Sequence, residues 1–227
     1  MVKKRLIISL TFNEGVLFRT KNFLPDYRYT KNFIDLWNAD EIILIDVSKK
    51  GKKLQKSFID VIRFFIENCY LPITVGGGIS SIEDAKKIFS LGVEKIIMNS
   101  STYKNPKITH DLVNIFGSSS IIQAIDMKKN DDGNYIIKVD NGKKTINRET
   151  NEYLEYVSSL NIGEIHLNSI DNDGGLMGFD LNLINKFASK INVPILVQGG
   201  GGNWNHFYEV LKLKNISGAC TQNIYHF

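Results

Sequence analysis

The feature that most constrains the fold is a sequence motif that occurs twice, about half a chain apart. The run PITVGGG at residues 72–78 recurs as PILVQGG at residues 194–200, a displacement of 122 residues. The run EIIL at residues 41–44 recurs as EIHL at residues 164–167, displaced by 123 residues. Matching motifs in matching order indicate two similar halves, each with a buried strand that ends in a glycine-rich turn. An open doubly wound sheet rarely repeats two glycine-rich strand ends in this way.

The order of strand and helix patterns identifies the kind of repeat. Continuously apolar strands that alternate with amphipathic helices indicate a parallel sheet covered on both faces. The strand runs are residues 6–10, 41–46, 73–75, 95–98, 121–125, 165–167, 194–197 and 218–221, and the clearest helical patterns are residues 58–68, 81–91, 149–160 and 203–212. We therefore predict an α/β fold, a (β/α)8 TIM barrel built of two half-barrels, with residues 1–227 as a single domain.

Two segments depart from the repeating pattern. Residues 128–148 contain the turn signals NDDGN and DNG on either side of YIIKV, so we predict a β-hairpin inserted after the fifth strand. At the other end, His226 and Phe227 follow closely on the eighth strand. We therefore expect the last helix to be short or missing.

Composition excludes several functional classes. The 227 residues carry 28 Lys and Arg against 24 Asp and Glu, and a net charge of +4 is too small to indicate nucleic-acid binding. No run approaches the roughly 20 apolar residues of a membrane span, and the N-terminus lacks a signal-peptide pattern. The two cysteines and four histidines have no metal-ligand spacing, so neither a metal nor a cofactor is expected. We expect a cytoplasmic protein without membrane partners.

Glycine-rich turns at two strand ends are candidate phosphate sites. Gly77 and Gly78 follow the third strand, and Gly199 and Gly200 follow the seventh, each pair leading toward a helix. Backbone N–H groups in such turns approach a phosphate closely, and the helix dipole favours its negative charge. Steric crowding is an alternative reason for glycine, but two turns at symmetry-related strands favour phosphate binding. Further donors follow the fourth and eighth strands: Asn99, Ser100, Gln222 and Asn223.

Two aspartates are the candidate acid–base residues. Asp126 ends the fifth strand and Asp173 follows the sixth. This places both at the carboxyl face of a barrel, where active sites of this fold form. A carboxylate positioned there is a candidate general acid or base, with a structural hydrogen-bonding role as the less favoured alternative.

These residues resemble a known family. The runs VGGGI, NS, AID and SIDNDG at residues 75–79, 99–100, 124–126 and 169–174 are similar, in order, to the cyclase subunit of imidazole glycerol phosphate synthase, and the likeness spans residues 4–227. The resemblance implies a barrel that receives ammonia from a separate glutaminase subunit at its N-terminal face. It further implies that ammonia cleaves and cyclises a bisphosphorylated ribulosyl aminoimidazole carboxamide, with one phosphate at each glycine-rich turn. The family's products are imidazole glycerol phosphate and an aminoimidazole carboxamide ribotide, in histidine biosynthesis.

The family's ammonia entrance is ringed by four charged residues at the starts of the strands. On this sequence they fall on Arg5, Glu41, Lys95 and Glu164, and all four charges are present. Charges at a barrel bottom must be paired to avoid a cost of several kcal/mol, and two bases with two acids meet that need. A purely stabilising ion-pair cluster is the alternative, although apolar residues would close an ordinary barrel. The four charges therefore predict a heterodimer with a glutaminase and argue against a related isomerase that uses none.

The sequence departs from the family at the first strand. The family has catalytic aspartates ending strands one and five; here Asp126 ends the fifth strand, whereas Thr11 occupies the first position. Threonine is no general acid or base near neutral pH, so the two-carboxylate mechanism lacks one of its groups. Arg19 stands in place of a lysine in the first loop, and Asn168 in place of a threonine beneath Asp173.

Three functions remain open at this point. The first is the histidine-pathway cyclase, with Glu14 in the following loop as the nearest substitute for the missing acid. The second is a diverged paralogue that passes ammonia to another acceptor, for example to amidinate a surface sugar. Thr11 favours this second function, and so do Gln198 and Gln222, which crowd the second phosphate turn, whereas the overall likeness to the family favours the first. The third is a non-cyclising scaffold that activates the glutaminase and channels ammonia.

Overall fold

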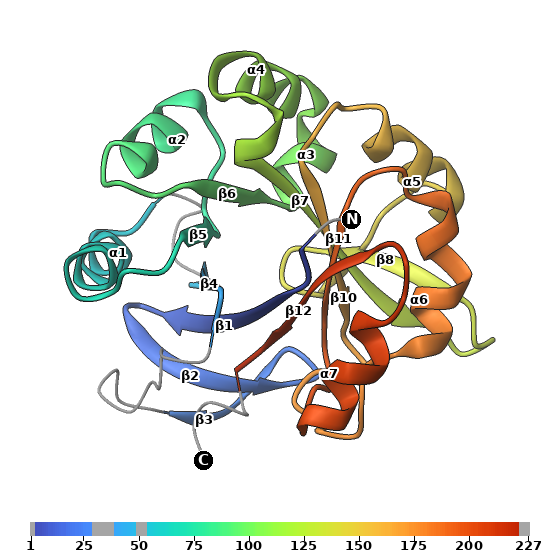
Figure 1. Cartoon of the computed structure of the whole chain (residues 1–227). Helices are drawn as coiled ribbons and strands as arrows, with labels where there is room; N and C mark the ends of the chain where they lie inside the picture. The colour runs from blue at the N-terminus through green and yellow to red at the C-terminus, as the bar shows by residue number, and fades with distance from the viewer. Residues whose placement is uncertain (1–2, 29–38, 49–53, 223–227) are drawn as a thin grey trace.

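The computed structural model describes residues 3–28, 39–48 and 54–222, and its centre is a closed barrel of parallel strands (Figure 1). The barrel strands are, in order, β1 (Arg5–Asn13), β4 (Glu41–Asp46), β5 (Ile73–Gly76), β6 (Lys95–Met98), β7 (Ile121–Lys129), β10 (Glu164–Ser169), β11 (Ile195–Gln198) and β12 (Ile216–Thr221). Each is parallel to the next along the chain, and β12 pairs with β1 to close the ring. The prediction of a (β/α)8 barrel is therefore confirmed.

The helices pack around the outside of the barrel (Figure 1). Within the described residues they are α1 (Lys56–Asn68), α2 (Ile82–Phe89), α3 (Ser100–Lys104), α4 (Pro106–Phe116), α5 (Thr150–Ser158), α6 (Leu181–Phe187) and α7 (Trp204–Leu211), with short 3-10 turns η2 (Ser118–Ser120) and η3 (Ala188–Lys190). Ser81, Asp180 and Asn203 cap α2, α6 and α7 by accepting a hydrogen bond from a first-turn backbone N–H. In this described part, no helix has the length and apolar character needed to cross a membrane. The expectation of a short or missing last helix concerns residues 223–227, which lie outside the described residues.

The first strand of each half of the barrel extends into an antiparallel hairpin. β1 pairs with β2 (Val16–Lys21), which pairs with β3 (Leu24–Arg28), and β7 pairs with β8 (Tyr135–Val139), which pairs with β9 (Lys144–Thr145). Residues 128–148 thus hold β8 and β9, while β7 itself continues to Lys129. The loop expected after the first strand is in fact the β2–β3 hairpin. Glu14 and Gly15 both have positive φ angles and form the tight turn that joins β1 to β2.

Apolar residues fill two cores. The outer core lies between the barrel and its helices and includes the buried rings of Phe12, Phe58 and Phe65. The inner core fills the barrel and consists of Ile7, Ile43, Ile97, Ile122, Ala124, Leu196 and Cys220. Successive residues of a strand point to opposite faces, so the odd-numbered residues of β1 face the barrel interior. β1 therefore presents Arg5 at one end of the interior and Thr11 at the other.

Candidate active site

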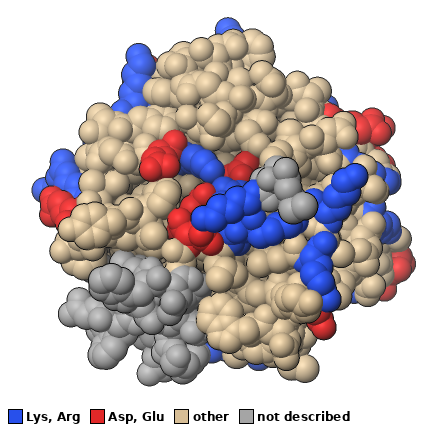
Figure 2. Space-filling view, viewed as in Figure 1, with Lys and Arg blue, Asp and Glu red and all other residues tan. Residues whose placement is uncertain are grey.

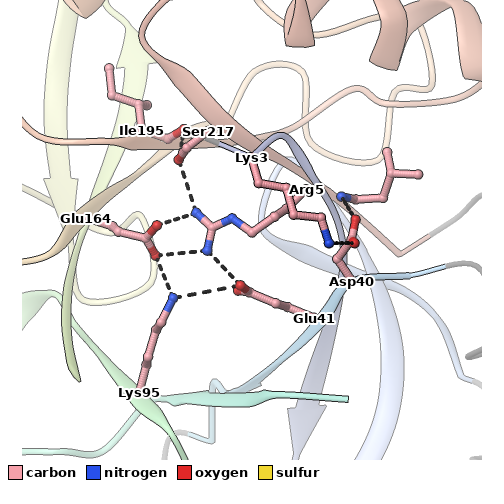
Figure 3. Close-up of polar contacts among 9 residues, drawn as sticks. Lys3, Arg5, Asp40, Glu41, Lys95, Glu164, Ile195 and Ser217 are labelled. Carbon is pink, nitrogen blue, oxygen red and sulfur yellow. Dashed lines mark hydrogen bonds and ion pairs between the residues drawn. The ribbon is translucent and has the colours of Figure 1, made fainter. Parts of the chain in front are cut away.

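Four charged residues meet at the N-terminal end of the barrel. Arg5 donates to Glu41 Oε1 over 2.7 Å and also to Glu164, and Lys95 Nζ lies 3.1 Å from Glu164 Oε2 and 3.8 Å from Glu41 Oε1 (Figure 3). Ser217 accepts a further hydrogen bond from Arg5 over 3.1 Å. We call Arg5, Glu41, Lys95 and Glu164 the charged ring. The four residues predicted from the family resemblance thus lie together and form alternating ion pairs.

Burial makes the charged ring sensitive to the loss of any member. The side chains of Arg5, Glu41 and Glu164 are each about 10% exposed. Burial alone lowers the pKa of Arg5, but the hydrogen bonds and charges of Glu164 and Glu41 outweigh it, so that pKa lies above its ordinary value. Figure 2 shows charges of both signs gathered at the centre of this face, beside broad uncharged surface.

The glycine turns lie at the opposite end, on β5 and β11. Gly77 has a φ of +97° and Gly199 a φ of +102°. A Cβ at Gly77 would lie 2.1 Å from the carbonyl oxygen of Asp46, and one at Gly199 would lie 2.4 Å from that of Ser169. Gly78 and Gly200 also have positive φ angles. Each turn therefore passes over the end of the preceding barrel strand, which makes glycine sterically necessary whether or not phosphate binds.

The steric requirement predicts a large stability loss on adding one methyl group. Gly77→Ala should lower the free energy of unfolding by about 3 kcal/mol or more, because backbone strain adds to a clash with another backbone. Gly117 is a matched control, since it has a φ of +86° and open space around its Cβ position. Gly117→Ala should cost only about 1 kcal/mol. Urea denaturation of both variants measures the difference, and equal losses would show that the turn relaxes around the methyl group.

Asp126 is the most perturbed carboxyl group at the carboxyl end. It ends the inward face of β7, is 8% exposed and accepts hydrogen bonds from Asn99 over 2.8 Å and from Asn168 over 3.3 Å. Burial raises the pKa of Asp126 to about 7, the two amide hydrogen bonds oppose that rise, and the charge of Asp173 adds to it. A carboxyl group with a pKa near 7 is suited to both proton donation and proton acceptance at neutral pH.

Asp173 holds the first hairpin against the barrel. Its carboxylate accepts the backbone N–H of Phe23 over 3.0 Å, and its carbonyl accepts that of Asn22 over 3.1 Å. Arg19 donates to the carbonyl of Gly174 over 3.2 Å. Burial raises the pKa of Asp173, although the hydrogen bonds from Thr20 and Phe23 and the charge of Arg19 oppose the rise. Asp173 thus fastens the β2–β3 hairpin, a contact that sequence reasoning missed.

Thr11, Arg19 and the glycine turn of β11 surround a small space under this hairpin, whereas Asp126 and the glycine turn of β5 do not line it. The mouth cavity, about 30 Å³ in volume, is lined by Ser9, Thr11, Arg19, Thr20, Asp173, Gly174, Gln198, Gly199, Gly200, Gly201, Cys220, Thr221 and Gln222. Gln222 donates to the carbonyl of Phe18 over 3.0 Å, which ties the hairpin to β12. Ser100 accepts the backbone N–H of Asp140 over 2.8 Å and so contacts the second hairpin. Asn223 lies outside the described residues.

Sequence reasoning also missed a polar pair inside the barrel. His166 Nε2 lies 3.1 Å from Gln198 Oε1, and the His166 side chain is buried. The alternation of EIHLNS on β10 gives a signal for it, because Glu164, His166 and Asn168 share the inward face. A histidine considered alone, without its inward neighbours, indicates only a buried polar residue.

The fold and the site together define a class of protein. A closed (β/α)8 barrel whose carboxyl end combines a buried acid, amide donors and glycine turns has the architecture of the barrel enzymes. Residues 11–227 match the family model described as Histidine biosynthesis protein, and the chain belongs to that family.

Three relatives show which proteins of this family the chain is similar to. The chain is 32% identical to the imidazole glycerol phosphate synthase subunit HisF of Hydrogenobaculum sp. (strain Y04AAS1), over 100% of this chain and 92% of the relative. It is 34% identical to the subunit of the same name from Clostridium botulinum (strain 657 / Type Ba4), with the same coverage. It is 33% identical to a Parasynechococcus marenigrum (strain WH8102) relative whose name carries the label hisF2, over 87% of that relative. The family resemblance drawn from the motifs is confirmed.

Proposed function

We propose that this chain is the barrel subunit of a synthase of the imidazole glycerol phosphate synthase type, fed with ammonia by a separate glutaminase. The observation that carries the proposal is the placement of two unlike polar sites at opposite ends of one barrel. The charged ring closes the N-terminal end, and Asp126 lies at the carboxyl end with Asn99 and Asn168. A glutaminase would dock on the face around the charged ring, and ammonia would leave the barrel beside Asp126.

The carboxyl end has the groups that a bisphosphorylated substrate needs. The two glycine turns would each hold one phosphate through backbone N–H groups, with Arg19 as the nearby cation. Asp126, with a pKa near 7, would transfer protons during ring closure. The mouth cavity of about 30 Å³ is far smaller than the several hundred Å³ of a typical ligand pocket. Substrate binding therefore requires the β2–β3 hairpin to move away from Asp173 and Gln222.

A second candidate function is favoured by one position. Thr11 lines the mouth cavity where the resembling family has its other catalytic aspartate, so the site holds Asp126 without that partner. A diverged subunit that delivers ammonia to another acceptor, such as a sugar to be amidinated, fits this loss. A scaffold that only activates the glutaminase fits it as well. All three functions take ammonia from a glutaminase. They differ in the molecule that accepts the ammonia and in whether the carboxyl end of the barrel catalyses that reaction.

A substitution in the charged ring tests the ammonia supply that the three candidate functions share. Lys95→Ala should lower product formed per glutamine hydrolysed by about tenfold, equal to about 1.4 kcal/mol of coupling, while activity with added ammonium salt is retained. The reason is that Lys95 forms ion pairs with both Glu41 and Glu164. Its loss would widen the entrance and leave it with a net negative charge. Assays of glutamate and of product in the complex with the glutaminase measure the ratio.

Lys3→Ala is the matched control for this experiment. Lys3 lies near the charged ring and pairs with Asp40 over 2.8 Å, but its side chain is 79% exposed, so the pair contributes little (Figure 3). The coupling ratio of this variant should equal that of the wild type. Equal losses with glutamine and with added ammonium salt in Lys95→Ala would mean that the ring does not control ammonia entry.

A further inference from the structure

One strand carries polar side chains along the whole length of the barrel interior. Glu164, His166 and Asn168 alternate on β10, and all three are buried. Glu164 belongs to the charged ring, and Asn168 donates to Asp126 over 3.3 Å. The inward face of β10 therefore connects the charged ring to the candidate acid.

Packing gives no reason for this polar strip. Barrel interiors are normally filled with branched apolar side chains, as the inner core does here with Ile7, Ile43, Ile97, Ile122 and Leu196. A buried polar group left without a hydrogen bond costs about 1–3 kcal/mol. Placing Glu, His and Asn at three interior positions of one strand is thus unfavourable unless each group has a polar partner. Glu164, His166 and the amide nitrogen of Asn168 have partners within the protein, whereas Oδ1 of Asn168 has none among the described residues.

The middle of the strip is polar but uncharged. His166 hydrogen-bonds Gln198 over 3.1 Å. Burial lowers the pKa of His166 to about 4, although the Gln198 hydrogen bond and the charge of Glu164 oppose the shift. A neutral imidazole presents one donor and one acceptor nitrogen, so this segment favours a neutral hydrogen-bonding molecule over a cation.

The mouth cavity lies at the upper end of the strip. Ser9, Gln198 and Cys220 line its inner side, and its volume of about 30 Å³ suits a molecule of the size of water. The hydroxyl of Ser9 and the Oδ1 atom of Asn168 are buried and have no hydrogen-bond partner within the described residues. Asn168 is the register partner of Gln198. A small molecule that both donates and accepts hydrogen bonds could pair with the hydroxyl of Ser9 and with the amide of Gln198 beside it.

We propose that the inner side of the mouth cavity, at Ser9 and Gln198, is a binding site for one molecule of ammonia that arrives along β10 past His166. This assignment rests on the proposed function, because it takes ammonia as the molecule that crosses the barrel. The hydroxyl of Ser9 donates to the lone pair of ammonia, and the amide oxygen of Gln198 accepts an ammonia N–H. Ammonia bound at this site lies between the uncharged His166 and Thr11 and remains there until the acceptor substrate binds.

Binding can be tested directly on the whole chain. Ammonium chloride is titrated at about pH 8.5 while the side-chain amide signal of Gln198 is followed by NMR, with its assignment taken from the signal lost in Gln198→Ser. We expect a saturable shift of that signal that potassium chloride at equal ionic strength does not reproduce. In Ser9→Ala the half-saturating concentration should rise at least about tenfold, the equivalent of losing one hydrogen bond of about 1.4 kcal/mol.

Ser169→Ala is the matched control. Ser169 is a buried serine of β10 whose hydroxyl contacts Asn172 and Asp180 outside the barrel interior, so the titration of Ser169→Ala should match that of the wild type. An equal shift with potassium chloride, no saturation, or equal behaviour of the two serine variants would overturn the proposal. The titration needs neither glutaminase nor acceptor. A saturable shift without glutamine-dependent transfer would therefore keep the ammonia site and reject the proposed function.

Discussion

Replacing Thr11 by aspartate is expected to raise ammonia-dependent cyclisation of the ribulosyl substrate by about 10²–10⁴-fold over a very slow wild type. The range is what one positioned acid–base group typically contributes. Thr11 faces the mouth cavity from β1, is 8% exposed and pairs in register with Phe18 and Ile45, so the backbone already holds the position. A carboxylate there would restore a second acid at the carboxyl end of the barrel, the end that also holds Asp126.

The restored rate should remain below that of a complete enzyme. Gln222 still binds the carbonyl of Phe18 and Asp173 still holds Phe23, so the first hairpin stays fastened over the cavity. Small displacements of reacting groups are expensive, on the order of 10²-fold for 1 Å. A second buried carboxylate also raises the pKa of Asp126 above its present value of about 7, which moves the pH optimum upward.

Two variants separate the new acid from other effects of the substitution. Thr11→Asn adds the same bulk without the charge and should give no gain. Asp126→Asn in the Thr11→Asp background should remove the gain, since both acids are needed. A wild-type rate of about 1 s⁻¹ or more would contradict the premise, because that rate is typical of an intact enzyme. No gain in Thr11→Asp, with substrate still bound, would favour a different ammonia acceptor.

The barrel could be predicted from the sequence because its signals are local and repeated. Each apolar run ends in a polar or glycine turn, and the two glycine turns recur with the same backbone strain at Gly77 and Gly199. The β2–β3 hairpin could not be recognised in the same way. The turn from β1 into β2 at Glu14 and Gly15, and the β2–β3 turn at Asn22 and Phe23, both lack the Asn-Gly or Asp-Gly pair that marks the commonest tight hairpins.

Contacts within the site follow from closure of the barrel rather than from local sequence. Phe23 and Asp173 are 150 residues apart, and His166 and Gln198 are 32 apart, so neither pair has a pattern that joins its members. The charged ring was located through the family resemblance, which supplied four positions but not their pairing. The perturbed pKa of Asp126 likewise depends on burial that only the folded chain creates.

Replacing Asp126 by asparagine in the wild type is expected to make the protein more stable at pH 8, because a buried carboxylate is removed. The pKa of this carboxyl is about 7 in the folded protein against 3.8 ordinarily. Between these two values the folded state holds a proton that the unfolded chain has released. The free energy of unfolding of the wild type therefore falls as pH rises through this window and is level above about pH 7. At about 1.4 kcal/mol per pH unit, the free energy of unfolding falls by up to about 4 kcal/mol across the whole window.

Because asparagine does not ionise, the free energy of unfolding of the variant should not fall in this pH window. Its amide would also donate to Oδ1 of Asn168, which is buried without a partner in the described structure, and would still accept from Asn99. Urea denaturation should show the variant more stable than the wild type at pH 8 and nearly equal to it at pH 4. Asp60→Asn, at a carboxylate with a 57% exposed side chain, is the control and should change little at either pH. An Asp126→Asn difference that is the same at both pH values would mean that Asp126 is ionised throughout, and its role in proton transfer near neutral pH would have to be abandoned.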